Sequence, residues 1–205
     1  MMRDLESEFG GIDIHLFDQL LKGRIPAGSV VFDAGCGRGR NLVWFLRQGY
    51  EVRGADADRD AVAATRQLAS QLAPTIATDA FRVEPIEAMT FPAGHADVVI
   101  SSAVLHFARD DEQFWAMLRG SWRMLRPGGL LFCRTAGMTG QEGEATPLGG
   151  RRYLLPDGSE RFLSDVALLR DATRTLGGEL MDPIKTTVVH GQRSMMTWVV
   201  RNSHR

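Results

Sequence analysis

Three glycines and an acid stand close together in the segment DAGCGRG, residues 33–39. Gly35, Gly37 and Gly39 alternate with other residues directly after Asp33 and an apolar run. Glycine lets the backbone approach a ligand closely and adopt positive φ angles without steric cost. The spacing G-x-G-x-G differs from the G-x-G-x-x-G of dinucleotide sites, and an acid two positions earlier suits a cationic group better than a pyrophosphate. The segment therefore predicts a loop that holds a ligand with a cationic group.

A second acid follows at a distance typical of nucleoside sites. Asp56 lies 17 positions after Gly39, at the end of the β-rich segment 50–56. An acid at the tip of this second strand is placed to accept hydrogen bonds from ribose hydroxyls. The first turn of the helix after the loop offers free N–H groups to an anionic ligand group. The loop and Asp56 together predict a site for a nucleoside cofactor.

A parallel sheet is needed to bring these residues together, and the chain alternates short β-rich segments with helical patterns. That alternation predicts helices packed on a mostly parallel sheet. Asp58 and Ser164 are expected to cap two of the helices. The expected strands are 29–33, 50–56, 81–83, 97–101 and 130–134, and the expected helices are 40–49, a segment from 59 to about 72, 110–125 and 165–176.

The chain changes character after residue 135. Residues 136–150 contain five glycines and few large apolar side chains, which predicts a flexible connector. It is either a lid over the site or a surface insertion with no part in turnover, and we prefer the lid. Residues 151–163 predict a hairpin turned at 156–159, either a solvated element or, because both arms are basic, one that recruits an anion or a partner. The segment 185–201 predicts two final strands.

Four segments together resemble the class I S-adenosylmethionine (SAM)-dependent methyltransferases. DAGCGRG resembles the first motif of that family, EVRGADAD the second, ADVVISSAVLHF the fourth-strand segment and RMLRPGGLLF the signature before the fifth strand. They span Val30 to Arg134 in the family's order. Within the family, CGRGRN followed by GYEV is most similar to the tellurite-resistance methyltransferases and nearby small-molecule enzymes.

The resemblance implies a fold and a function. The fold is a Rossmann-like, doubly wound, mostly parallel seven-stranded sheet with an antiparallel last strand and a hairpin inserted after the fifth strand. We expect a single domain over residues 1–205, with an N-terminal helical cap at 1–28 and an insertion at 136–163. The implied cofactor is SAM, which leaves as S-adenosylhomocysteine, and the implied acceptor is a small molecule methylated by in-line displacement.

The resemblance also implies a cofactor site. In this family an Asp after the third strand commonly contacts the adenine amino group, but here Pro85 occupies that position. Glu84, Glu87 or the backbone of residues 86–87 are the alternatives, and we prefer Glu87. The implied cofactor-binding residues are Asp33, Gly35, Cys36, Gly37, Gly39, Asn41, Asp56, Ala57, Ile86, Glu87, Ser101 and Ser102.

The acceptor decides whether a catalytic base is needed. SAM already carries the activated methyl group, so a soft or anionic acceptor needs no base, whereas an oxygen or nitrogen acceptor would need one. The candidates are His106, after the fourth strand, and His190, with Arg193 at the same turn. Structural or surface roles are the alternative for each of the three.

Composition limits the classes of partner. A net charge of −1 disfavours a dedicated nucleic-acid binder. The two cysteines lack metal-ligand spacing, which argues against a metal site. They also do not suggest a disulfide framework, which favours a reducing, cytoplasmic setting. The N-terminal residues lack the pattern of a signal peptide and no apolar run is long enough for a membrane span. The pattern specifies neither the acceptor's identity nor an oligomeric state.

Other functions on a similar fold have to be weighed. A nicotinamide-dependent oxidoreductase is disfavoured by the glycine spacing. A non-catalytic SAM-binding or scaffold protein is an alternative, because sequence alone does not prove turnover. A methyltransferase acting on a macromolecule is a further alternative, disfavoured by the net charge.

Overall fold

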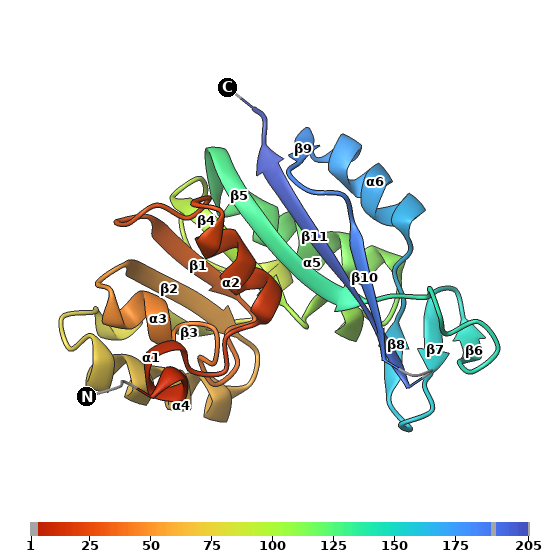
Figure 1. Cartoon of the computed structure of the whole chain (residues 1–205), viewed down its shortest axis with the longest axis horizontal. Coiled ribbons are helices and arrows are strands. Elements are labelled where there is room, and N and C mark those ends of the chain that lie inside the picture. The colour runs from red at the N-terminus through yellow and green to blue at the C-terminus, as the bar shows by residue number, and fades with distance from the viewer. Residues whose placement is uncertain (1–3, 190–191, 205) are drawn as a thin grey trace.

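One large sheet joins strands from both halves of the chain (Figure 1). The computed structural model describes residues 4–189 and 192–204. In these ranges eight strands form the sheet, in the order β10-β11-β5-β4-β1-β2-β3, with β9 paired to β11. The strands are β1 (Val30–Ala34), β2 (Glu51–Asp56), β3 (Phe81–Val83), β4 (Ala96–Ser102), β5 (Leu125–Ala136), β9 (Gly178–Leu180), β10 (Lys185–Val189) and β11 (Arg193–Asn202).

The direction of the strands follows the doubly wound pattern. The pairs β1–β2, β1–β4, β2–β3 and β4–β5 are parallel, whereas β11 runs antiparallel to both β5 and β10. The predicted mostly parallel sheet with an antiparallel last strand is therefore confirmed, and the short β9 is an added edge pairing. The carboxyl ends of β1, β2, β4 and β5 meet at one edge, where ligands bind in such sheets.

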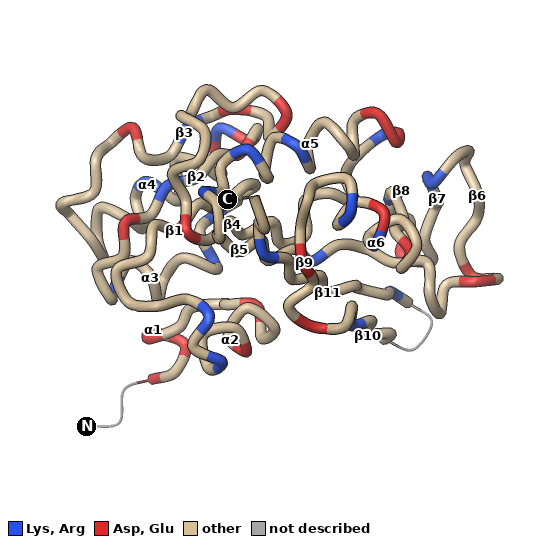
Figure 2. The backbone as a smooth tube through the Cα atoms, turned by 90° about the horizontal axis from the view of Figure 1, so that it is seen from above, with Lys and Arg blue, Asp and Glu red and all other residues tan. Residues whose placement is uncertain are grey.

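Helices cover both faces of the sheet (Figure 2). Apolar side chains alternate along β4: Val98 and Ile100 belong to the core cluster that includes α2 (Ile14–Leu21), α3 (Val43–Arg47) and α4 (Arg59–Leu72). Val99 belongs to the cluster that includes α5 (Asp111–Arg123) and α6 (Val166–Thr175). None of the described helices is long and apolar enough to cross a membrane. The helices are α1 (Leu5–Phe9), α2 (Ile14–Leu21), α3 (Val43–Arg47), α4 (Arg59–Leu72), α5 (Asp111–Arg123) and α6 (Val166–Thr175), and the 3₁₀ turns are η1 (Thr78–Ala80), η2 (Ile86–Ala88) and η3 (Leu105–Phe107).

Local hydrogen bonds explain where the helices begin. The Asp58 side chain accepts hydrogen bonds from the backbone N–H groups of residues 60 and 61, so the predicted cap of α4 is confirmed. The predicted cap of α6 is wrong, because Asp165 rather than Ser164 accepts the N–H of Leu168. The first helix after the glycines is shorter than predicted, because the chain turns through residues 35–42 before α3 begins.

The insertion after β5 is a small sheet of its own. The strands β6 (Thr146–Gly149), β7 (Arg152–Leu154) and β8 (Glu160–Phe162) are antiparallel neighbours, and β7 and β8 form the predicted hairpin. In the segment predicted to be a flexible connector, 136–150, the last residues form β6, while its mobility stays a prediction. Its first residues are held as well, because the N–H of Met138 donates to the carbonyl of Ser164 over 2.9 Å.

Helix α5 fixes the segment that follows β3. Gly120 of α5 lies against η2, and a Cβ atom at Gly120 would stand 2.1 Å from the carbonyl oxygen of Ile86. Arg123 of the same helix donates to the carbonyls of Met89 and Phe91 over 2.6 and 2.8 Å. The position of Ile86 and Glu87 at the sheet edge therefore depends on a close helix-to-backbone contact.

Replacing Gly120 by Ala tests this contact. The methyl group would push η2 away, and we expect Gly120→Ala to lower the free energy of unfolding by about 1–3 kcal/mol. Without a clash, Gly→Ala within a helix normally stabilises it by about 1 kcal/mol. Urea denaturation measures the change, and Arg119→Ala at an exposed position of α5 is the control. Equal or greater stability of Gly120→Ala would show that α5 does not support η2 in this way.

Candidate active site

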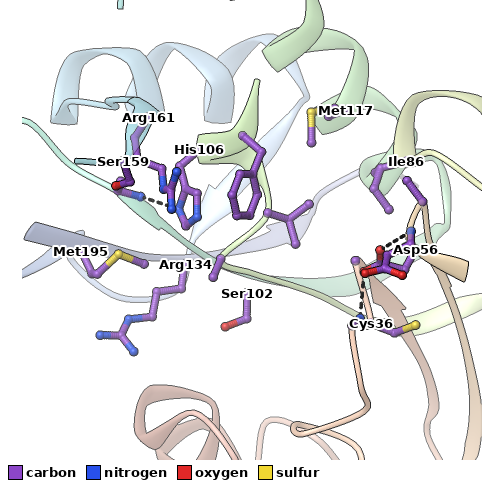
Figure 3. A pocket seen from close by; sticks show the side chains of 18 of the residues that line it. Cys36, Asp56, Ile86, Ser102, His106, Met117, Arg134, Ser159, Arg161 and Met195 are labelled. Carbon is purple, nitrogen blue, oxygen red and sulfur yellow. Dashed lines mark hydrogen bonds between the residues drawn. The ribbon is translucent and has the colours of Figure 1, made fainter. Parts of the chain in front are cut away.

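A large cavity opens at the carboxyl edge of the sheet (Figure 3). Its volume is about 1030 Å³. Side chains from two regions form it: a loop end, with Cys36, Asp56 and Ile86, and an insertion end, with Ser159, Arg161 and Met195 (Figure 3). Cavities that take one small molecule measure about 300–1,000 Å³. The volume is therefore sufficient for a cofactor and a second small molecule.

The three glycines of the loop have different surroundings. All have positive φ, at 93° for Gly35, 51° for Gly37 and 79° for Gly39. A Cβ atom at Gly35 would lie 2.2 Å from Val104, and one at Gly39 would lie 2.8 Å from Leu68. A Cβ atom at Gly37 would have nothing within 4 Å, although Gly37 lines the cavity. Gly35 and Gly39 thus allow the chain to pack, and Gly37 leaves space free for a ligand.

Asp56 ties the loop to the start of α4. Its Oδ2 accepts the N–H of Gly37 over 2.8 Å and its Oδ1 accepts the N–H of Asp58 over 2.9 Å. The loop is held from its other side as well, because the Thr65 hydroxyl donates to the Gly37 carbonyl over 2.7 Å. Each carboxylate oxygen can accept a further hydrogen bond, so Asp56 remains able to bind hydroxyl groups in the cavity.

Asp33 lies behind the loop and does not line the cavity. The side chain is buried, and its Oδ1 has no hydrogen-bond partner in the described part of the chain. Burial and the neighbouring Asp56 charge raise the pKa of Asp33 well above its usual range, and Arg40 offsets part of this effect. A cationic ligand near Asp33 and Asp56 would favour the ionised form of Asp33. This environment fits the cationic group predicted from the sequence.

A polar cluster connects the N-terminal segment to the cavity wall. The buried Asp13 caps α2 through the N–H of His15, and its Oδ2 accepts Nη1 of Arg134 over 2.7 Å. The backbone N–H of Asp13 donates to Oδ1 of Asn41 over 3.0 Å. Ser102 approaches the same carboxylate at 3.4 Å. Asp13 therefore orients Arg134, Asn41 and Ser102, all of which line the cavity.

The turn after β4 carries backbone strain at the cavity wall. Ala103 has φ 64°, a conformation that costs a residue with a Cβ about 1–2 kcal/mol. Its N–H donates to the carbonyl of Arg134 over 2.8 Å, which holds the turn against β5. The strain brings the chain around Ser102 and Val104 to the edge of the cavity, as strained turns often do at functional sites.

His106 lies between the two ends of the cavity as a neutral ring. Its Nδ1 accepts the backbone N–H of Ala136 over 3.2 Å, so the proton of the neutral ring is on Nε2. Burial, with a smaller effect from the Arg161 charge, lowers the pKa of His106 to about 4. The ring is thus a hydrogen-bond donor at neutral pH and is poorly suited to accept a proton.

Most of the residues predicted for the site line the cavity. Asp33, Gly39 and Ser101 lie behind it, and His190 lies outside the described residues. Glu84 faces elsewhere, because its carboxylate accepts the backbone N–H and the hydroxyl of Thr90. The predicted residues that line the cavity are Gly35, Cys36, Gly37, Asn41, Asp56, Ala57, Ile86, Glu87, Ser102, His106 and Arg193.

The insertion contributes to the site through the hairpin rather than through the connector. Leu155, Asp157, Ser159 and Arg161 line the cavity, whereas none of the residues 137–150 does. That the connector forms a lid stays a prediction; in the structure the hairpin turn, not the connector, lines the cavity. The basic composition of the hairpin was the signal for Arg161; no sequence signal pointed to Asp13, which lies far from the motifs.

The described residues that line the cavity provide neither a reactive thiol nor a metal centre. Cys36 lines it, but burial and the charges of Asp33 and Asp56 raise the pKa of its thiol, which keeps it protonated. Among the described residues, no group of three or more His, Cys, Asp or Glu side chains is arranged to hold a metal ion.

The sequence and the fold both match known proteins. Residues 32–133 match the family model described as a methyltransferase domain. A SAM-dependent methyltransferase from Methanosarcina mazei superposes with a TM-score of 0.73 at 17% identity, covering 91% of this chain and 98% of that one. The chain belongs to the class I SAM-dependent methyltransferases.

Further solved structures share the fold of this methyltransferase. The 1,6-didemethyltoxoflavin-N1-methyltransferase of Burkholderia thailandensis has a TM-score of 0.70 at 18% identity, with 98% of this chain and 82% of that chain covered. The magnesium protoporphyrin IX methyltransferase of Synechocystis PCC 6803 has a TM-score of 0.66 at 20% identity, with 93% and 77% covered. No curated protein sequence matches the methyltransferase.

The lowered pKa of His106 predicts how stability depends on pH. The unfolded chain binds a proton at His106 below about pH 6.5, but the folded protein does so only near pH 4. The free energy of unfolding therefore falls by about 3 kcal/mol in total as the pH is lowered from about 6.5 to about 4. Urea denaturation between pH 7 and 4 should show this extra loss in the wild type but not in His106→Gln. Parallel pH profiles would contradict the assignment.

Proposed function

We propose that this methyltransferase transfers the methyl group of SAM to a small-molecule acceptor. The observation that carries the proposal is one continuous cavity that joins the glycine loop and Asp56 to the hairpin, with a volume suited to two ligands. We further propose that residues 1–205 act as one domain, in which 1–28 form a cap and 136–163 form the insertion.

Observations at the loop end support the binding of SAM there. Gly37 leaves free space at the cavity wall, Asp56 has acceptor capacity for ribose hydroxyls, and the acidic pair Asp33 and Asp56 suits a cation. Ile86 and Glu87 would face the adenine. The residues that we propose to hold or support the cofactor are Asp33, Gly35, Cys36, Gly37, Gly39, Asn41, Asp56, Ala57, Ile86, Glu87, Ser101 and Ser102.

The residues of the chain bind, orient and shield the reactants. When bound, SAM supplies an electrophilic methyl carbon. Catalysis then depends on alignment of the acceptor and on exclusion of water, for which the hairpin and the cluster around Arg134 are available. His106 offers its Nε2–H to the acceptor and does not serve as the base, because Nδ1 is already engaged.

A small molecule is the acceptor that the neighbours favour. The Burkholderia structure contains 1,6-didemethyltoxoflavin, and the Synechocystis enzyme is named for magnesium protoporphyrin IX. A hairpin that closes one end of the cavity also suits a compact acceptor better than a chain. We propose a cytoplasmic setting, which the two free cysteines, Cys36 and Cys133, support.

Substitution of Asp56 tests the cofactor site. Asp56→Ala removes charged hydrogen-bond acceptors, each worth about 1.5–3 kcal/mol, so binding of SAM and S-adenosylhomocysteine should weaken roughly 10- to 100-fold. Isothermal titration calorimetry measures the affinities. Asp60→Ala, in the first turn of α4 and outside the cavity, is the control and should bind normally. Equal affinity in Asp56→Ala and the wild type would remove Asp56 from the site.

Gly37 allows the second test. A methyl group there meets only the space proposed for the cofactor, so Gly37→Ala should weaken S-adenosylhomocysteine binding by at least about tenfold. Gly49→Ala is the matched control, because Gly49 also has a positive φ and open surroundings but lies outside the cavity. Both variants should lose about 1 kcal/mol of stability. A folded Gly37→Ala protein with wild-type affinity would refute the role of the loop.

A further inference from the structure

An arginine of the hairpin forms no ion pair with any described residue at the cavity wall. Arg161 on β8 lines the cavity, with its guanidinium 4.8 Å from the centre of the Phe107 ring. Its side chain donates one hydrogen bond, to the carbonyl of Glu160. The neighbouring Arg151 and Arg152 form ion pairs, with Asp165 and Glu160 respectively, but between described residues none involves Arg161. The hydrogen bonds from Ser159 and, to a smaller extent, the charge of Arg161 lower the pKa of Asp157, but no ion pair joins Arg161 to Asp157, so the guanidinium can still bind a ligand. Figure 3 shows Arg161 beside Ser159 and His106.

At the insertion end of the cavity, Arg161, Arg193 and Asp157 together carry one net positive charge. Arg193 lines the same wall and, in the described part of the chain, likewise forms no ion pair. Asp157 is the acid at this end, and its Oδ1 already accepts both the N–H and the hydroxyl of Ser159. Arg134 is neutralised by Asp13. Two arginines against one carboxylate favour a ligand with a single negative charge.

Apolar surface surrounds these charges. Phe107 is 58% exposed although the guanidinium lies over its ring, and it lines the cavity together with Met117, Leu155 and Met195. Flexible methionine side chains and an open aromatic ring adapt well to a flat, apolar ligand. This wall of the cavity thus combines an apolar surface, on which an aromatic ring can pack, with a guanidinium that can bind an anion.

His106 adds a constraint on the acceptor. Because its Nδ1 accepts the N–H of Ala136, the ring presents a donor at Nε2 and no free acceptor. A carboxylate is already ionised at neutral pH and can accept this hydrogen bond. The donors at this end of the cavity thus match an anion better than a neutral acceptor.

We propose that the acceptor is an aromatic carboxylate with one negative charge, held by the guanidinium of Arg161 with its ring among Phe107, Leu155 and Met195. The inference rests on the proposed function, since it names the substrate class of the same cavity. A guanidinium binds a carboxylate in a bidentate manner, which would also fix the orientation of the ring. Arg161 is then the residue that selects the charge of the acceptor.

Binding of simple acids tests this inference without turnover. The probes are benzoate and salicylate, with benzamide and salicylamide as neutral analogues, each added to protein saturated with S-adenosylhomocysteine. Saturation-transfer NMR detects weak binding. The wild type should bind both acids, and the amides at least about fivefold more weakly. Arg161→Met should lose the preference for the acids, whereas Arg152→Met, which removes a charge from the same small sheet outside the cavity, should retain it.

The outcomes separate the two proposals. Calorimetry should give the same affinity for S-adenosylhomocysteine in all three proteins, which also shows that the variants are folded. If the wild type does not bind S-adenosylhomocysteine, the proposed function fails. If it binds S-adenosylhomocysteine but binds the acids no better than the amides, or binds neither, the carboxylate proposal is overturned and the proposed function stands. An acid preference that persists in Arg161→Met would also overturn it.

Discussion

The hydrogen bonds of one carboxylate hold the loop end of the cavity together. Asp56 sits at the tip of β2 and accepts the N–H of Gly37, from the turn after β1, and that of Asp58, where α4 begins. Charge-assisted bonds of this kind are shorter and stronger than neutral ones. They fix three segments of chain at one point of the sheet edge. The free space at Gly37 exists because its backbone is held from one side by Asp56 and from the other by Thr65.

Asp13 has a similar effect on the opposite wall. It is fully buried, and its carboxylate is compensated by Arg134 and by hydrogen-bond donors from α2 and Ser102. A buried carboxylate without partners is costly, so the N-terminal segment and the end of β5 depend on each other. The N-terminal segment therefore has a share in the shape of the cavity, even though Asp13 does not line it.

The sequence predicted the features that depend on residues close together in the chain or at the ends of neighbouring strands. The glycine spacing, Asp56 and the cap at Asp58 act between residues close in sequence or at neighbouring strand ends, and the strands and their direction followed from the alternation. Asp13 and Arg134 are 121 positions apart in the sequence and meet only through tertiary packing, so no sequence pattern predicted their ion pair. Likewise, five glycines suggested a flexible connector, but pairing with β7 orders its last residues into β6.

The two ends of the cavity come from separate stretches of chain. The loop end is formed mainly by turns of the large sheet between β1 and η2, whereas the strands β6, β7 and β8 of the insertion pair with one another and only its base, at Ala136 and Gly137, bonds to β11. Exchange of the hairpin would leave the register of the large sheet intact. The residues of the hairpin turn can therefore change without altering the strand pairing that holds the glycine loop and Asp56 in place.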